Sequence, residues 1–103
     1  MDTRIQEIAE ILSSHRGAGN KITSAAIARK IGIYEDDTHA QTRALIKQAA
    51  EQFELPLAGD GKGYFMITSE EELNAYIANL NSRIAGIEER KQMIIRNFRK
   101  GKK

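Results

Sequence analysis

The residue types that carry out catalysis or bind metal ions are few in this 103-residue chain, and their spacing suits neither task. The chain has no cysteine, so neither a disulfide nor a thiolate zinc site can form. The two histidines, His15 and His39, lack the short spacing that is typical of metal ligands. Ser13 and Ser14 adjoin His15 in sequence, which does not make an oriented catalytic triad. We therefore expect no enzyme activity, no metal site and no cofactor.

The glycine-rich segment GDGKG at residues 59–63 invites comparison with a phosphate-binding loop. Phosphate-binding loops of the known kinds lead into a helix, whereas an apolar, strand-like run follows this segment. The segment therefore predicts a hairpin turn. The loop HRGAGN at residues 15–20 could form a small anion-binding nest, but we favour a plain loop. No small-molecule ligand is evident.

Positive charge is concentrated near the carboxyl-terminal end of the chain. Residues 90–103 carry seven basic residues and no acidic one, a net charge of +7. Residues 1–89 carry nine basic and fourteen acidic residues, a net charge of −5. A basic tail on an acidic body suits an anionic partner such as nucleic acid. A frayed, solubilising helix end is the alternative interpretation.

Length and composition favour one small domain, with an appended element, in a soluble intracellular protein. With 41% hydrophobic residues, the chain can bury one modest core. No apolar run approaches the roughly 18 residues that a membrane span requires. The amino-terminal segment MDTRIQEIAEIL lacks the basic start and continuous apolar core of a secretion signal. We expect a cytoplasmic protein without a membrane partner.

Apolar spacing predicts two helices in the first third of the chain. The first, at residues 3–14, places four apolar side chains on one stripe, namely Ile5, Ile8, Ile11 and Leu12. Lys21 and Ile22 could form a brief strand. Thr23 is suited to cap a second helix at about residues 24–31, which Gly32 ends.

A third helix is predicted after the acidic turn YEDD at residues 34–37. Thr38 or Asp37 can cap this helix, which is expected to continue to about Glu54. Acidic residues at this place suit the positive end of a helix. The side chains expected to face inward are Thr42, Leu45, Ile46, Ala49 and Phe53.

A hairpin and a long helix are predicted for the rest of the chain. Two β-like runs, at residues 55–58 and 64–68, flank the glycine-rich turn, and Pro56 favours an edge strand. Ser69 and Glu72 have the spacing of a capping box for a helix that extends to about Lys100.

The long helix carries a heptad repeat, in which apolar residues recur at alternating steps of four and three. Its a positions are Ile77, Ile84, Lys91 and Phe98, and its d positions are Leu73, Leu80, Ile87 and Ile94. Nearly four heptads span about 39 Å at 1.5 Å per residue. Because a small domain cannot cover so long a seam, we expect a homodimer paired through these eight residues. A lone helix docked on its own domain is the alternative, and the repeat allows parallel or antiparallel pairing.

The predicted fold class is mainly α with a small β-hairpin (α+β). Residues 3–68 resemble the winged helix-turn-helix family, in which three helices precede a hairpin called the wing. The resemblance rests on KITSAAIARKIGI as second helix and turn, THAQTRALIKQAAEQF as recognition helix, and LPLAGDGKGYFMI as wing. The chain is also similar to small winged-helix proteins of prokaryotic viruses and proviruses. The expected domains are residues 1–68, a dimerising helix at 69–100 and a disordered basic tail at 101–103.

The resemblance implies that the exposed face and amino-terminal half of the third helix contact DNA. Gln41 is suited to an adenine edge, and Arg43 to a guanine or a phosphate. The remaining residues suit mainly phosphates, which position the protein without specifying a sequence. The full candidate set is Lys21, Ser24, Arg29, Thr38, His39, Gln41, Arg43, Lys47 and Lys62.

The sequence thus predicts specific binding of double-stranded DNA by a homodimer, as a transcriptional regulator or a viral accessory factor. Two observations oppose this prediction. The acidic residues Glu35, Asp36 and Asp37 lie where phosphates would approach, and no strong basic stripe marks the third helix. The alternatives are a protein-interaction or assembly module that uses the last helix, and non-specific nucleic-acid binding by the basic tail.

Overall fold

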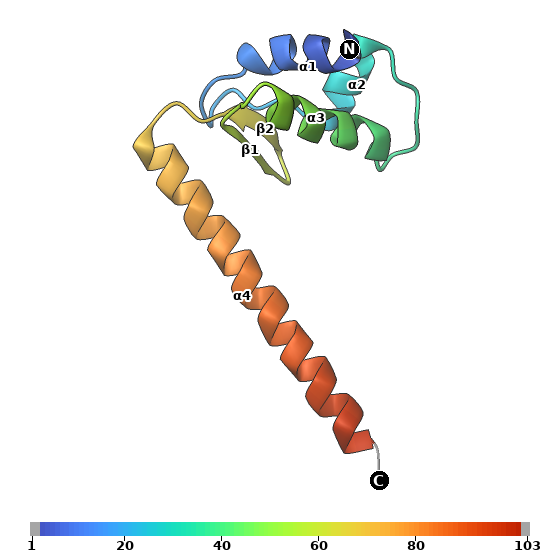
Figure 1. Ribbon diagram of the computed structural model, residues 1–103, viewed down its shortest axis with the longest axis vertical. Helices are drawn as coiled ribbons and strands as arrows, with labels where there is room; N and C mark the ends of the chain where they lie inside the picture. Colours follow the sequence, from blue (N-terminus) through green and yellow to red (C-terminus); the bar gives the residue numbers. More distant parts are fainter. Residues whose placement is uncertain (1–2, 102–103) are drawn as a thin grey trace. The chain divides into compact units, whose positions relative to one another are not determined.

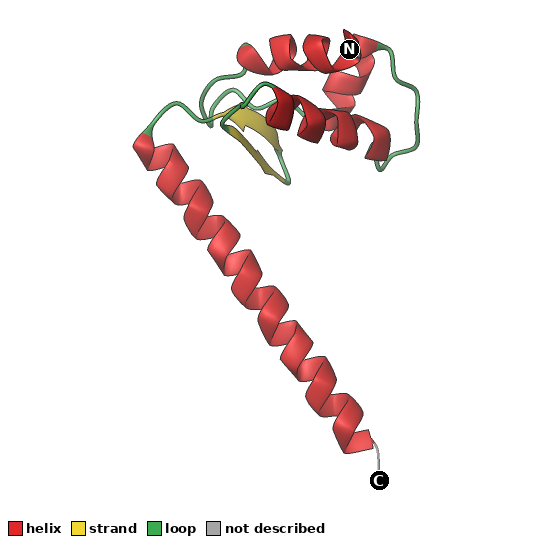
Figure 2. Ribbon diagram, viewed as in Figure 1, coloured by secondary structure: helices red, strands yellow, loops and turns green. Residues whose placement is uncertain are grey.

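The computed structural model describes residues 3–101, and this part of the chain contains four helices and one two-stranded antiparallel sheet (Figure 1, Figure 2). This architecture confirms the predicted α+β class with a long last helix. The elements are α1 (Thr3–Ser13), α2 (Ser24–Ile31), α3 (Ala40–Gln52), β1 (Leu57–Asp60), β2 (Gly63–Met66) and α4 (Glu70–Gly101). The chain divides between Glu72 and Leu73 into two compact units.

The core of the first unit forms where α1 packs against α2, α3 and β2 (Figure 1). Ile8, Leu12 and Ile27 have no exposed surface, and Ile46 is 2% exposed. The predicted apolar side chains of α1 and α3 therefore face this core, with the exception of Ile11 and Phe53, because burial of apolar surface is the main favourable term in folding. Ile11 differs from the prediction, since it is only partly buried. Ala9, which was not predicted to face inward, is buried in the core.

The boundaries of α2 agree with the prediction. The hydroxyl of Thr23 accepts a hydrogen bond from the backbone N–H of Ala26 at 3.1 Å. Gly32 ends the helix in the left-handed conformation, with φ of 76°, and its N–H donates to the carbonyl of Ala28. Glycine adopts this conformation without the steric cost of a Cβ atom.

The inward position of Phe53 was predicted wrongly, and α3 ends two residues before the predicted Glu54. The helix ends at Gln52, and Phe53 follows as its carboxyl-terminal cap with 39% of its surface exposed. Glu54 then adopts a left-handed backbone conformation, with φ of 52°. Phe53 N still donates to Ala49 O at 3.0 Å, so the chain leaves the helical path at Glu54, one residue after Phe53.

The predicted hairpin is present, with its strands shifted along the sequence. Pro56 precedes β1, and the strand continues through Gly59 to Asp60. Asp60 pairs with Gly63, so the turn is tighter than the sequence suggested. Ile22 adds a short third segment to the sheet, because Tyr64 N donates to Ile22 O at 2.7 Å and Ile22 N donates to Tyr64 O at 2.9 Å.

The first turn of α4 is tied to the first unit by Glu72. Ser69 caps the helix as predicted, accepting from Glu72 N at 3.1 Å. The Glu72 carboxylate does not complete the capping box; it accepts from Thr68 N at 2.8 Å and from Ala18 N at 2.7 Å. These bonds hold the pKa of Glu72 below its ordinary value.

The remainder of α4 is exposed along most of its length. None of its residues is buried, and its apolar stripe ranges from 36% exposed at Leu80 to 64% at Ile84. Gly101 belongs to the helix, and residues 102–103 of the predicted tail lie outside the described residues. Among residues 3–101, no helix has the length and apolarity needed to cross a membrane.

Gly63 provides a sensitive test of how the hairpin meets the segment before α2. Its φ is 137°, and a Cβ atom placed on it would lie 2.7 Å from the carbonyl oxygen of Ile22. Gly63→Ala should therefore lower the free energy of unfolding by about 1–3 kcal/mol, as measured by urea denaturation. Gly61→Ala in the same turn is the control, because a Cβ there meets nothing within 4 Å. Equal destabilisation by both substitutions would contradict this close approach of the two backbones.

Candidate nucleic-acid interface

The candidate interface is the solvent-exposed face of α3. Thr42, Leu45, Ile46 and Ala49 fix the opposite face of this helix in the core. Gln41, Arg43 and Lys47 are exposed, as the sequence predicted. A helix held on one side and polar on the other has the shape that a DNA major groove can accept.

Two further residues belong to this face. Ala44 and Gln48 are exposed and lie three and seven residues after Gln41, which places them on the same side of α3. The helical spacing itself could have identified them. A methyl group such as that of Ala44 can contact thymine, and a carboxamide such as that of Gln48 can pair with adenine.

The amino-terminal end of α3 is capped by Glu35, which corrects the predicted cap at Thr38 or Asp37. His39 occupies the cap position in a left-handed conformation and makes no side-chain capping bond. The Glu35 carboxylate accepts from Gln41 N at 2.8 Å and from Thr42 N at 3.0 Å. It also accepts a hydrogen bond from the buried Thr42 hydroxyl.

The capping carboxylate changes how a phosphate could meet α3. Free N–H groups at the start of a helix attract anions. Here Glu35 occupies two of those groups, and its negative charge would repel a second anion. Hydrogen bonds from the Thr42 hydroxyl and the two N–H groups hold the pKa of Glu35 below its ordinary value, so it is ionised at neutral pH. Glu35 therefore leaves the side of α3, and not its first turn, as the surface that could accept DNA.

Thr38 and His39 are less available for DNA contact than the sequence suggested. Thr38 donates from its backbone N–H to Asp36 at 3.0 Å, and its hydroxyl also donates to Asp36. These bonds lower the pKa of Asp36. His39 is half-buried, and its Nδ1 atom is buried without a hydrogen-bond partner among the described residues. Neither side chain extends from the exposed face of α3.

Lys21 is held by an ion pair. Its Nζ atom lies 2.8 Å from Asp60 Oδ2 at the end of β1, and 5.7 Å from the centre of the Phe65 ring. The Lys21 contact is the largest cause that lowers the pKa of Asp60. Asp60 also accepts a hydrogen bond from the backbone N–H of Lys62 at 2.8 Å. The side chain of Lys62 is exposed at the hairpin turn.

The two candidates on α2 differ in exposure. Ser24 is half-buried at the first residue of the helix, whereas Arg29 is exposed in its last turn beside Lys30. The exposed positive charge of the candidate set is thus carried by four residues, Arg29, Arg43, Lys47 and Lys62. They lie on α2, on α3 and at the turn between β1 and β2.

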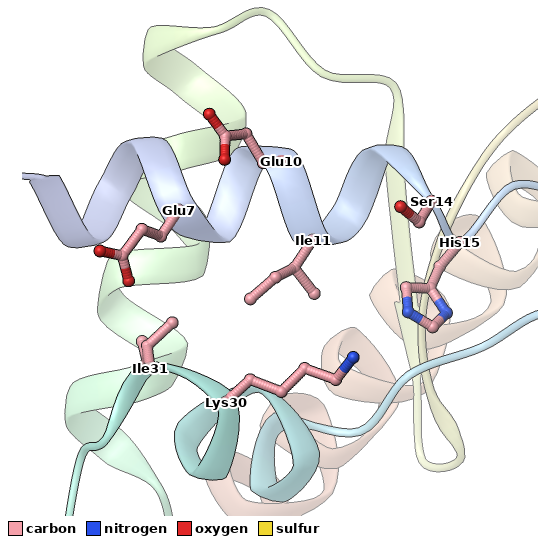
Figure 3. Close-up of a pocket in the computed structure, with 7 residues that line it drawn as sticks. All are labelled: Glu7, Glu10, Ile11, Ser14, His15, Lys30 and Ile31. Atoms are coloured by element: carbon pink, nitrogen blue, oxygen red, sulfur yellow. The ribbon is translucent and has the colours of Figure 1, made fainter.

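A shallow pocket of about 390 Å³ lies between α1 and α2, away from the exposed face of α3 (Figure 3). Ile11 and Ile31 face each other across it, and Lys30 extends beneath Ile11 (Figure 3). Its other lining residues are Glu7, Glu10, Ser14 and His15. Within residues 3–101, no group of three or more His, Cys, Asp or Glu side chains could hold a metal ion.

No protein-family model, no curated protein and no solved structure matches the chain. The function must therefore be argued from the residues described above.

The role of Glu35 predicts a pH-dependent stability. Since folding lowers its pKa below the ordinary value of 4.5, Glu35 stabilises the protein fully above that pH. This stabilisation is lost as the pH falls through the folded-state pKa. Glu35→Gln should thus be less stable than the natural chain at neutral pH, and the difference should shrink in acid, as urea denaturation across this range would measure.

Glu51→Gln is the matched control, because it removes an exposed carboxylate from the last turn of the same helix. It should change the free energy of unfolding at neutral pH less than Glu35→Gln does, because Glu51 lies at the far end of the helix from the capped N–H groups. A stability difference for Glu35→Gln that is constant from neutral to acidic pH would contradict the capping role.

Proposed function

We propose that this chain binds double-stranded DNA sequence-specifically, as a homodimer, with α3 in the major groove. The observation that carries the proposal is the exposed polar face of α3, set opposite a fully packed face. The order of three helices and a hairpin supports the same interpretation, since it is the order of the winged helix-turn-helix family that the sequence resembles.

Base recognition is assigned to the middle of α3. Gln41 can pair with an adenine edge, and Ala44 can contact a thymine methyl group. Arg43 can reach a guanine or a phosphate from the flank of the helix. Gln48, one turn beyond Ala44, extends the same face along the groove.

Phosphate contact is assigned to exposed cations around this face. Lys47 on α3, Arg29 on α2 and Lys62 at the hairpin turn are exposed. Lys21 and Thr38 contribute less directly, because Asp60 and Asp36 already hold them. Residues 1–72 carry eight basic and twelve acidic residues, so the net charge of this unit, −4, opposes DNA binding.

The basic end of the chain supplies further, non-specific attraction. Residues 73–103 carry eight basic and two acidic residues, a net charge of +6. Such charge binds DNA through release of counterions and lets a protein move along the duplex. In this proposal α3 selects the site, and the residues after Glu89 strengthen binding without selecting it.

The proposed biological role is that of a small transcriptional regulator or a viral accessory factor. Such a protein acts in the cytoplasm, on the nucleoid or in the cytoplasm of an infected host. Dimerisation is assigned to the exposed stripe of α4, and a two-fold dimer would present two copies of α3 to a site with two-fold symmetry. The pairing residues are Leu73, Ile77, Leu80, Ile84, Ile87, Lys91, Ile94 and Phe98.

Two lysine substitutions test the proposal against a matched change of charge. Lys47→Ala should weaken binding to random duplexes and lower the slope of log K against log salt by about one unit. Lys30→Ala removes the same charge from the exposed end of α2, outside the candidate face, and should change the slope less. Fluorescence anisotropy on labelled duplexes measures both. Equal effects of the two substitutions, or no binding at low salt, would contradict the proposal.

A second candidate function is an assembly module in which α4 binds a protein and the first unit never meets DNA. The exposed apolar stripe of α4 and the net charge of −4 on residues 1–72 favour it. This function predicts that Arg43→Ala with Lys47→Ala leaves partner binding intact. The same double substitution therefore distinguishes the two functions, because DNA binding should be weakened by it and protein binding should not.

A further inference from the structure

The apolar stripe of α4 needs a partner, and its exposure identifies which residues the partner covers. Ile84 is 64% exposed, Ile87 63% and Ile94 57%. Most of the stability of helices in proteins comes from packing of an apolar face, and no residue of this face of α4 is buried within residues 3–101. Another apolar helix with the same repeat is the partner that the a and d positions fit.

The geometry points to a second copy of this chain, paired through α4 in the antiparallel direction. This inference rests on the homodimer of the proposed function and adds the orientation of its two helices. The arguments are the position of Lys91 in the stripe and the distribution of charge along α4.

The heptad spacing allows every a position to meet a d position of an antiparallel partner. The stripe is symmetric about the midpoint between Ala85 and Gly86. The residue pairs that lie at equal distances from this midpoint are Leu73 with Phe98, Ile77 with Ile94, Leu80 with Lys91, and Ile84 with Ile87. Antiparallel pairing therefore fills four layers at each side without a gap.

Lys91 distinguishes the two directions. In a parallel dimer, Lys91 meets Lys91 of the other copy at a seam position, where two like charges repel each other. In the antiparallel dimer, its aliphatic stem lies opposite Leu80 of the other copy and the ammonium group can reach solvent. Its Nζ atom already lies 3.0 Å from Glu88 of the same helix, which shows that the charge can leave the stripe.

The charges at the two ends of α4 favour the same direction. Glu70 and Glu71 are exposed in the first turn, and Arg99 and Lys100 are exposed in the last. Antiparallel pairing sets each acidic end beside a basic end of the other copy. Parallel pairing sets the two basic ends, with seven basic residues each in residues 90–103, side by side.

Antiparallel pairing accounts for this distribution of charge better than the helix dipole or parallel pairing does. Charges at the ends of a helix interact favourably with its dipole, but that effect is confined to the first and last turn. Arg90, Lys91 and Arg96 lie before the last turn. Parallel pairing would bring Arg83 near Glu88 of the other copy, whereas antiparallel pairing sets Arg83 near Arg90. Each exposed pair has a small effect. Parallel pairing gains two such pairs, but it also brings together two ends that carry seven basic residues each.

The consequence for function is a wide separation of the two first units. Each is attached at the start of its own α4, so antiparallel pairing places the two attachment points at opposite ends of the helix pair. The stripe from Leu73 to Phe98 measures about 39 Å at 1.5 Å per residue. A parallel dimer would attach both units at the same end.

Cysteine cross-linking of the full-length chain tests the direction, because the natural chain has no cysteine. The two variants are Ile77→Cys and Ile94→Cys, each purified separately and then mixed in equal amounts under oxidising conditions. Antiparallel pairing predicts a disulfide-linked dimer in the mixture. It predicts no disulfide-linked dimer when either variant is oxidised alone. In that arrangement the two copies of position 77 lie about 26 Å apart, far beyond disulfide reach.

The matched control is the pair Ala75→Cys and Arg96→Cys, which lies at nearly the same levels on the exposed face opposite the stripe. This pair should give no cross-linked product, alone or mixed. Circular dichroism and sedimentation velocity establish that each variant keeps its helices and its dimer mass. Since Ile77 and Ile94 are exposed within the single chain, their replacement leaves the core of the first unit intact.

Cross-linking of Ile77→Cys alone would establish parallel pairing and overturn the inference. A monomer by sedimentation of the natural chain, or a dimer that cross-links in neither arrangement, would also overturn it. The experiment contains no DNA, so failure of the DNA-binding proposal would leave its result unchanged. Conversely, the anisotropy of Lys47→Ala can succeed or fail whichever way the helices pair.

Discussion

The contact between Glu35 and the start of α3 is the interaction on which the candidate interface depends. The carboxylate satisfies the N–H groups of Gln41 and Thr42 and receives the Thr42 hydroxyl, which is fully buried. A buried hydroxyl without a partner would be costly, so this contact fixes the first turn of α3. Together with the burial of Leu45, Ile46 and Ala49 it sets the rotation of the helix about its axis. The rotation in turn determines that Gln41, Ala44 and Gln48 face solvent.

This contact also limits the ways in which the protein can meet DNA. The ionised Glu35 closes the first turn of α3 to phosphates, and Asp36 with Asp37 adds negative charge nearby. Recognition by the side of α3 avoids that region. Under the proposed function, the unit with net charge −4 would supply shape and base contacts, while residues 73–103, with net charge +6, would supply attraction.

Local signals predicted much of the fold. Thr23 and Gly32 bound α2, and Ser69 precedes α4, because a cap acts within one turn of its helix. Contacts between distant residues could not be predicted in this way. Glu35 caps a helix across seven residues although Thr38 is a better local candidate, and Lys21 pairs with Asp60 thirty-nine residues later. The sequence therefore identified the exposed residues Gln41, Arg43 and Lys47, but not the contacts that restrain Thr38 and Lys21.

Selection of bound duplexes from a random pool tests the central claim, that the exposed face of α3 reads DNA sequence. The proposal predicts that the natural chain enriches one recurring sequence and that Gln41→Ala loses enrichment at a single base position while keeping the rest. The spacing of repeated half-sites would also report how the dimer presents its two copies of α3. Bound duplexes with the same composition as the input pool would contradict the claim.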